Sequence, residues 1–233
     1  MTYSDLKADF THAKKYLDVL EPDGDFTFQT FSDDARNKMP HLTRIVHGKL
    51  DEHFELLSKL NSEGAGVFVA INKTDLLGRG KTNITGVRSI FVDLDGAPIQ
   101  PLIECHHEPH MIVESSPGRW HAFWLVDTDF VKDKFATFQT TLANKFNGDL
   151  QVKDLPRVMR LPGFYHNKLN KNGTKKEPVM TKIEQTVNLP KYSLKSLQSA
   201  FPPTVKTDQN EKTDTKEKNA YSGDELETAL TYL

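Results

Sequence analysis

The sequence has little of several things, and each shortage excludes a class of protein. Of its 233 residues only Cys105 is a cysteine, so no disulfide can form within the chain, which fits a reducing cytoplasm. No apolar run is long enough to cross a membrane, and the first twenty residues lack the continuous apolar region of a signal peptide. We therefore expect a soluble cytoplasmic protein with no membrane partner.

The chain also lacks an excess of basic residues. Its 30 Lys and Arg stand against 32 Asp and Glu, which gives a net charge of −2. No global positive field therefore indicates nucleic-acid binding. Enzymes that act on nucleic acid often confine their positive charge to one groove, so the balance argues weakly in either direction.

The composition changes abruptly after Pro203. Between Lys206 and Asn219 the side chains are only Lys, Asp, Glu, Thr, Gln and Asn, and such a segment cannot bury enough apolar surface to order itself. Ser222 and Glu225 then form a capping-box pattern for a new helix, inside which the sequence stops as if truncated. We expect a catalytic domain, a flexible charged linker and the start of a C-terminal helical module over 1–203, 204–221 and 222–233.

Periodicity and turn residues predict short strands mixed with helices. Amphipathic spacing predicts helices over 4–20, 41–61, 129–146 and 191–201. Apolar runs predict strands over 26–31, 67–71, 88–95 and 178–185, and a hairpin of strands over 111–114 and 120–126. Because strands and helices do not alternate regularly, the pattern favours the α+β class.

The strongest local signal is the pair Asp93 and Asp95 at the end of a predicted buried strand. Side chains alternate along a strand, so both carboxylates lie on one face while Val92 and Leu94 enter the core. Two carboxylates so close repel each other unless a cation neutralises them, and hard oxygen ligands suit Mg²⁺ or Mn²⁺. An Asp-Gly turn in which Asp95 only caps a loop explains the same residues, and the strand alone leaves both interpretations open.

A second group lies in the predicted hairpin, at Ser115, Ser116, Arg119 and His121. The tight turn would bring hydroxyl, guanidinium and imidazole groups together, with Arg119 and His121 on one face of the outgoing strand. Arginine holds phosphate oxygens by a fork of two hydrogen bonds, and histidine by a single one. Taken in isolation, a hairpin turn with a histidine at the edge of the core is the more frequent case.

A third group begins at Asp149 and continues through Arg157, Arg160 and His166. If the segment is helical, the two arginines lie about one turn apart. A carboxylate that leads into a basic stretch suits a complex of a metal ion with a triphosphate. A solvated basic loop is the usual alternative for such charges.

In this order and spacing the three groups resemble the archaeo-eukaryotic primase superfamily, especially the primase-polymerases of plasmids and phages. The pattern there is an Asp-x-Asp strand, a Ser…His hairpin and an Asp ahead of a basic segment. The matching residues here are Asp93, Asp95, Ser115, His121, Asp149, Arg160 and His166. The stretches 64–72 and 157–164 are similar to the plasmid and phage branch, and the resemblance covers roughly residues 26–176.

The resemblance implies a fold and an activity. The fold would be a primase-polymerase core, an antiparallel sheet with helices related to the RNA-recognition fold, joined to a smaller α/β unit. The activity would be primer synthesis on a single-stranded DNA template by metal-dependent nucleotidyl transfer from nucleoside triphosphates, in plasmid, phage or mobile-element replication. The truncated helix implies a replicative helicase as partner, in the same chain or in trans.

The resemblance also implies roles for the residues. Asp93, Asp95 and Asp149 would be the catalytic acids and would hold Mg²⁺ or Mn²⁺. Asp154 lies near enough to take the third place, but the distance from the acid to the basic pair in the family favours Asp149. The incoming triphosphate would be bound by Ser115, Ser116, Arg119, His121, Arg160 and His166.

Two alternatives belong to other classes of protein. Residues 91–96 also resemble the nucleophile strand of haloacid-dehalogenase-type phosphatases, in which Asp93 would be phosphorylated. That family usually has Thr or Val after the glycine and carries the motif near the N-terminus, whereas Ala97 follows here and about ninety residues precede. The other alternative is a catalytically inactive DNA-binding replication module, against which the presence of all three acids argues.

Overall fold

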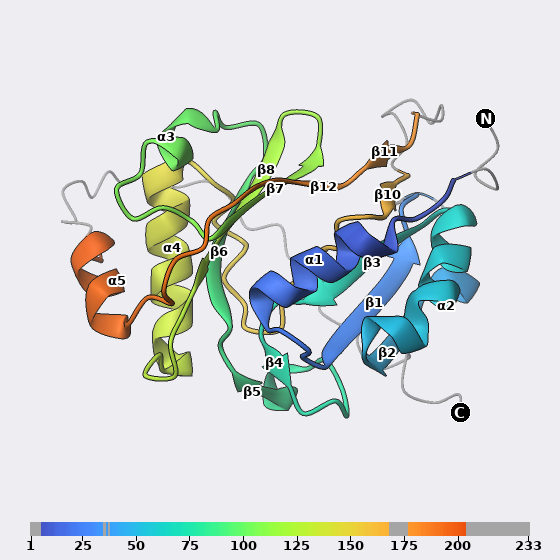
Figure 1. Ribbon diagram of the computed structural model, residues 1–233, viewed down its shortest axis with the longest axis horizontal. Coiled ribbons are helices and arrows are strands. Elements are labelled where there is room, and N and C mark those ends of the chain that lie inside the picture. The colour runs from blue at the N-terminus through green and yellow to red at the C-terminus, as the bar shows by residue number, and fades with distance from the viewer. Residues whose placement is uncertain (1–5, 35, 37, 168–176, 204–233) are drawn as a thin grey trace, which may run out of the picture. The chain divides into compact units, whose positions relative to one another are not determined.

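The computed structural model describes residues 6–34, 36, 38–167 and 177–203 of the chain (Figure 1). The predicted linker over 204–221 and the predicted helix start over 222–233 lie outside the described residues. None of the helices within the described ranges is long and apolar enough to span a membrane.

One antiparallel sheet has the strand order β2-β1-β3-β9. Its strands are β2 (Arg44–Gly48), β1 (Phe26–Ser32), β3 (Ala65–Ala70) and β9 (Val158–Arg160). Every residue of β3 is buried, because the strand is central in the sheet and helix α2 (Leu50–Ser62) packs against it. Leu50, Leu57 and Leu60 form the buried stripe of that helix.

A second antiparallel sheet has the order β12-β7-β8-β6. Its strands are β12 (Lys182–Thr186), β7 (Met111–Ser116), β8 (Arg119–Leu125) and β6 (Ser89–Leu94). Strand β6 lies at an edge, which helix α4 (Phe135–Phe146) covers (Figure 1). The buried amide of Gln139 accepts the N–H of Phe91 at 2.9 Å, so this edge donor is satisfied by a side chain.

Helix α1 (Phe10–Leu20) packs against α2, which covers the first sheet, and against β8 of the second sheet. Its Phe10 ring packs edge-on against Phe54 of α2 at 5.1 Å, and its Tyr16 ring packs edge-on against Phe123 of β8 at 5.8 Å. The smaller elements are β4 (Lys73–Thr74), β5 (Ile84–Gly86), α3 (Gln100–Ile103), β10 (Tyr165–His166), β11 (Val179–Met180), α5 (Leu194–Ala200) and the 3₁₀ turns Pro40–Leu42, Lys81–Asn83 and Lys132–Lys134.

The predicted α+β class is confirmed, whereas the predicted helix over 41–61 is wrong in its first third. Residues 44–48 form β2 and pair with β1, and the helix begins only at Leu50. Gly48, the last residue of β2, has a φ of 131°. Residues with a side chain rarely adopt this φ, and a helix excludes it. The first helix also begins later than predicted, at Phe10, where the Asp9 carboxylate accepts the N–H of His12.

The arginine segment is extended, not helical. Residues 158–160 form β9, which pairs antiparallel with β3 so that Arg160 lies opposite Phe68. The backbone of the buried strand β3 has donors and acceptors that must be paired, and β9 satisfies them on one side. The conditional expectation that Arg157 and Arg160 are one helical turn apart is therefore wrong.

Candidate active site

A pocket of about 240 Å³ lies between the two sheets. Every site residue predicted from the sequence contributes to its lining, namely Asp93, Asp95, Ser115, Ser116, Arg119, His121, Asp149, Arg160 and His166. Phe68, Val152, Arg157, Val158 and Met159 complete the lining. The structure thus gathers residues from β6, β7, β8, β9, β10 and the loop after α4 into one place.

The Asp-x-Asp strand follows the predicted alternation. Val92 and Leu94 are buried, while the Asp93 side chain is 28% exposed and that of Asp95 is 60% exposed. Strand pairing places Asp93 directly opposite His121 of β8. The Asp95 carboxylate forms an ion pair with Arg119, and His121 Nε2 lies 3.6 Å from Asp93 Oδ1.

The third acid reaches the pocket through a tight backbone approach. After α4 the chain turns at Asn147, which has a left-handed φ of 55°, and the N–H of Asp149 then donates to the Asp93 carbonyl at 2.9 Å. A Cβ on Gly148 would lie 2.8 Å from that same carbonyl oxygen and would overlap the Val92 side chain. Only glycine therefore allows Asp149 to lie beside the end of β6.

The other candidate for the third acid, Asp154, is not part of the pocket lining. Its carboxylate forms an ion pair with Arg157, whose Nη2 also donates to the Gln151 carbonyl at 2.7 Å. Asp149 is therefore better placed for the role than Asp154.

His121 is the buried member of the hairpin group, with only 5% of the residue exposed. Burial lowers the pKa of its imidazole, the nearby Asp93 carboxylate partly counteracts this, and the Arg160 charge lowers the pKa further. Within the described part of the chain no group forms a hydrogen bond with its buried Nδ1. The imidazole is therefore neutral near pH 7, with one ring N–H that can donate a hydrogen bond.

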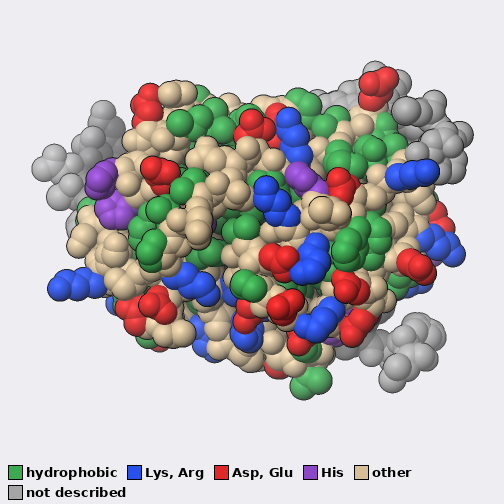
Figure 2. Space-filling view, in the orientation of Figure 1, with side chains coloured by type: hydrophobic (Ala, Val, Ile, Leu, Met, Phe, Trp, Pro, Cys, Tyr) green, Lys and Arg blue, Asp and Glu red, His purple; other side chains and the backbone are tan. Residues whose placement is uncertain are grey.

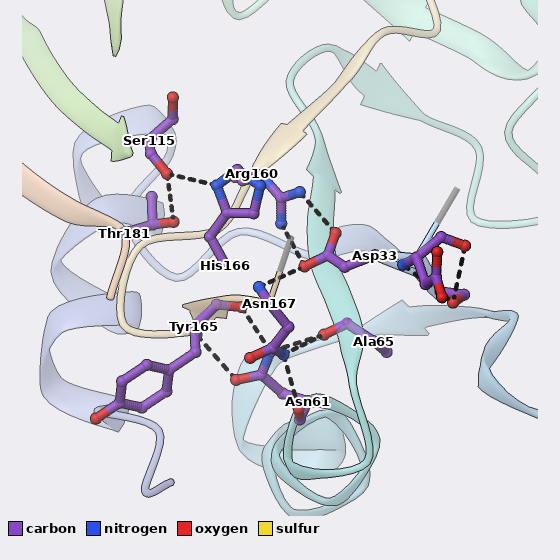
Figure 3. A network of polar contacts seen from close by, with 11 residues as sticks. Asp33, Asn61, Ala65, Ser115, Arg160, Tyr165, His166, Asn167 and Thr181 are labelled. Atoms are coloured by element: carbon purple, nitrogen blue, oxygen red, sulfur yellow. Dashed lines mark hydrogen bonds and ion pairs between the residues drawn. The ribbon is translucent and has the colours of Figure 1, made fainter. Parts of the chain in front are cut away.

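Arg160 is held on its own side of the pocket by an acid that the sequence did not reveal. Its Nη1 and Nη2 donate to the Asp33 carboxylate at 3.1 and 2.6 Å (Figure 3). Its guanidinium lies 4.7 Å above the centre of the Phe68 ring. Asp33 is 127 residues away in sequence, so no local pattern relates it to Arg160. His166 approaches from β10, and its Nδ1 lies 3.2 Å from the Ser115 carbonyl oxygen.

The carboxylate oxygens of Asp93, Asp95 and Asp149 are suitable ligands for a divalent cation, although the three groups are not close enough to bind one ion together. No group of three or more His, Cys, Asp or Glu side chains in the described ranges is close enough to hold a metal ion together. Asp95 is paired with Arg119, and Asp149 accepts the Gln151 N–H at 2.8 Å. Both residues are exposed, so their carboxylates can rotate toward Asp93 at little cost, and oxygen donors are those that Mg²⁺ and Mn²⁺ prefer.

Two other surface features do not coincide with the predicted site. A larger cavity, about 670 Å³, lies between α1 and residues 186–191 and includes none of the predicted site residues. On the face in Figure 2 acidic and basic side chains are interspersed. Neither feature gathers the predicted site residues, which all line the smaller pocket.

The chain belongs to a family of DNA primases. A family model described as the RepB DNA-primase N-terminal domain matches residues 51–191, more than half of the chain. The resemblance to primase-polymerases of the plasmid and phage type, on which the sequence argument rested, is thereby confirmed. No curated protein matches the chain.

Solved structures of two primases have the same fold. The primase-polymerase domain of cyanophage S-2L is 14% identical with a TM-score of 0.63, over 84% of this chain and 99% of that one. The primase RepB′ is 16% identical with a TM-score of 0.58, over 76% of this chain and 56% of that one. The catalytic domain of RepB′ in complex with initiator DNA is 16% identical with a TM-score of 0.53, over 75% and 85% of the two chains.

The fold does not fit the phosphatase alternative. That alternative needs Asp93 on a parallel, Rossmann-like sheet, whereas β6 pairs antiparallel with β8. Among the described residues the only parallel pairing is the isolated bridge between Val126 and Tyr192.

Proposed function

We propose that this chain synthesises short primers on single-stranded DNA by metal-dependent nucleotidyl transfer from nucleoside triphosphates. The observation that supports this most is the convergence of all predicted acids, hydroxyls, arginines and histidines on one pocket. The acids approach from β6 and the loop after α4, while Arg160 and His166 approach from β9 and β10. Such a division suits a substrate that carries both phosphates and a bound cation.

Asp93, Asp95 and Asp149 would hold Mg²⁺ or Mn²⁺. The chemistry that such ions supply when bound is activation of the primer 3′ hydroxyl and neutralisation of charge on the leaving pyrophosphate. The protein's own part is to keep the three carboxylates at one end of β6. Gly148 and the hydrogen bond from Asp149 to the Asp93 carbonyl serve this purpose.

The basic and hydroxyl side chains of the pocket, which come from both of its sides, would bind the triphosphate. Arg160 uses two N–H groups on Asp33, and a guanidinium has five, so donors remain for phosphate oxygens. The neutral His121 can donate one hydrogen bond without adding charge. With Ser115, Ser116, Arg119 and His166, these groups would hold the triphosphate in line, so that catalysis rests on positioning and charge stabilisation.

The family also supports a proposal for the wider setting. RepB′ has been solved with initiator DNA, and this supports a DNA template for the chain described here. We place the reaction in the cytoplasm, in plasmid, phage or mobile-element replication, with a replicative helicase in cis or in trans. A catalytically inactive DNA-binding module is the second candidate, and the separation of the carboxylates is the observation that favours it.

A primer-synthesis assay decides between them. The protein is incubated with single-stranded DNA, labelled ribo- or deoxyribonucleotides and Mg²⁺ or Mn²⁺, and the products are sized. We expect short products that the double variant Asp93→Ala with Asp95→Ala reduces at least about a thousandfold without changing the melting temperature. A variant that removes two exposed acids elsewhere, Glu55→Ala with Asp133→Ala, should keep full activity.

Primers made by the Asp93/Asp95 variant would refute the assignment of the acids. A wild-type chain that binds single-stranded DNA but makes no product with either ion would instead support the inactive module.

A further inference from the structure

Asp33 is an unusual acid because it is buried. It follows directly after β1, and its side chain is only 2% exposed. It is the one acidic residue among the buried residues of the described chain. A buried carboxylate is strongly unfavourable unless its charge is paired and its oxygens accept hydrogen bonds.

Each oxygen of this carboxylate is satisfied by groups that belong to the candidate active site. Oδ1 accepts Arg160 Nη2 at 2.6 Å, and Oδ2 accepts both Arg160 Nη1 at 3.1 Å and the backbone N–H of Asn167 at 2.8 Å (Figure 3). Asn167 follows His166 in the chain, so one carboxylate holds the Arg160 side chain and also the backbone next to His166.

The surroundings keep this pair in one geometry. A Cβ on Gly66 of β3 would lie 2.5 Å from Asp33 Oδ1 and 2.8 Å from Arg160 Nη1. The absence of a side chain at this position is therefore what lets the ion pair lie flat against β3. The Phe68 ring supports the guanidinium from below, and the Phe31 ring stacks on Phe68 at 4.3 Å.

The strand that carries His166 is tied from a second direction by Asn61 at the end of α2. The Asn61 side chain accepts the Tyr165 N–H at 2.9 Å and donates to the Tyr165 carbonyl at 2.8 Å. Asn167 Nδ2 in turn donates to the Asn61 carbonyl at 2.9 Å (Figure 3). His166 thus lies between two residues whose backbones are held by hydrogen bonds to the side chains of Asn61 and Asp33.

We propose that Asp33 is a positioning residue of the nucleotide site, which holds the Arg160 guanidinium and the His166 strand in place before a triphosphate binds. This inference rests on the proposed function. The carboxylate occupies two guanidinium N–H groups and so fixes the direction of the remaining ones. Groups that are oriented in advance need no reorganisation during the reaction, and this is where electrostatic catalysis gains most.

Stability alone does not explain a buried ion pair, because well-packed apolar residues of similar size often stabilise a fold as well or better. A structural role and a positioning role therefore differ in what Asp33→Asn does to the folded protein. In the structural case only the melting temperature falls. In the positioning case the reaction itself becomes slower per folded molecule.

The test is Asp33→Asn, compared with the same substitution at the neighbouring acid, Asp34→Asn, which pairs with Arg36 and not with Arg160. The asparagine keeps the size of the side chain but turns a donor toward Arg160 or toward the Asn167 N–H. We expect kcat for primer synthesis to fall between about tenfold and a hundredfold. The nucleotide KM should also rise at least about threefold, because an Arg160 guanidinium that is no longer held in place binds the triphosphate less well. Asp34→Asn should leave both constants unchanged.

A double-mutant cycle with Arg160→Gln identifies the route of the effect, and this variant keeps a side-chain donor for Asp33 so that the protein can fold. In the Arg160→Gln background, Asp33→Asn should lower kcat no more than about threefold further. The positioning role would be overturned if the two single fold-changes in kcat multiply in the double variant. It would also be overturned if Asp33→Asn lowers only the melting temperature.

Binding of inorganic tripolyphosphate separates failure of this inference from failure of the proposed function. If the wild-type chain makes no primers, the proposed function fails, but the cycle can still be measured on the tripolyphosphate Kd by calorimetry. Asp33→Asn should then shift this Kd at least about threefold with Arg160 present and not in the Arg160→Gln background. If primers are made and the kinetics of Asp33→Asn are unchanged, the inference fails and the function stands.

Discussion

The two sheets that enclose the pocket hold their charged side chains in opposite ways. On the β12-β7-β8-β6 sheet the ion pair of Arg119 and Asp95 is open to solvent, with side chains 46% and 60% exposed. On the β2-β1-β3-β9 sheet the ion pair of Arg160 and Asp33 is enclosed, with side chains 15% and 2% exposed. The same kind of contact is therefore adjustable on one side and fixed on the other.

The difference suggests a division of labour in the proposed reaction. Exposed carboxylates can exchange an arginine partner for a cation, because water screens the pair and each side chain can rotate. A buried guanidinium cannot move without leaving a carboxylate unpaired. We infer that the acid side adapts to the substrate complex and that the arginine side serves as its fixed reference.

Among the substitutions that compare the two sides, the largest effect should come from the acid whose position depends on Gly148. We expect Asp149→Asn to lower primer synthesis about a hundredfold to a thousandfold, because it removes a proposed cation ligand. The matched change Asp154→Asn should alter the rate less than about threefold, since Asp154 is not part of the pocket lining and its carboxylate only pairs with Arg157 at the edge of the pocket. The rates are measured with each nucleotide type on one template. The reverse order of the two effects would assign the third acid to Asp154.

How far the sequence alone could go is shown by these same acids. The common face of Asp93 and Asp95 was predictable, because side chains alternate along a strand whatever the rest of the fold is. The choice of Asp149 over Asp154 came from family resemblance, and its structural basis, a glycine that fits between Val92 and the Asp93 carbonyl, needs the packed fold.

The parts that sequence missed depend on distant partners. Asp33 belongs to no sequence motif, and its ion pair with Arg160 forms only because β1 and β9 lie on either side of β3. The amphipathic spacing around residues 44–48 predicts a helix, because the sequence shows this spacing but not the pairing of β2 with β1. Long-range pairing decided both cases, and no local propensity reports it.

The contrast between the two ion pairs can be measured as stability. Arg160→Ala leaves the Asp33 carboxylate buried and unpaired, so we expect the free energy of unfolding to fall by about 3–5 kcal/mol. Arg119→Ala removes a solvent-exposed pair and should cost under about 1 kcal/mol. Denaturant unfolding of both variants at one pH gives the comparison. Equal losses would show that the two sides are not different in the way their exposure suggests.

A smaller effect should follow when the enclosed pair is displaced but not broken. In Gly66→Ala the new methyl group would lie 2.5 Å from Asp33 Oδ1, and the pair must shift to make room. We expect a loss of about 1–3 kcal/mol in unfolding free energy together with a lower kcat. Gly86→Ala is the control, because its Cβ would meet only the Lys73 Cβ at 3.9 Å. An unchanged kcat in Gly66→Ala would mean that Arg160 tolerates displacement.

The smallest predicted effect concerns His121, where the two sides meet. Its pKa is lowered from 6.5 by burial, so below pH 6.5 the unfolded chain binds a proton that the folded protein excludes. The contribution of His121 to the free energy of unfolding is therefore fully present above pH 6.5 and is lost as the pH falls from 6.5 through the lowered pKa. His110, which is also buried and has a lowered pKa, contributes in the same direction. Melting temperatures between pH 7 and pH 5 should fall, and less steeply in His121→Gln.

The charges around His121 provide a sharper form of this prediction, because one comes from each side of the pocket. Asp93 raises its pKa and Arg160 lowers it. Asp93→Asn should therefore shift the NMR titration of His121 to lower pH, and Arg160→Gln should shift it to higher pH. A titration that responds to Asp93 but not to Arg160 would contradict the coupling between the two sides. A response to both would show that the fixed arginine acts on the acid side through the field in a shared pocket, without touching it.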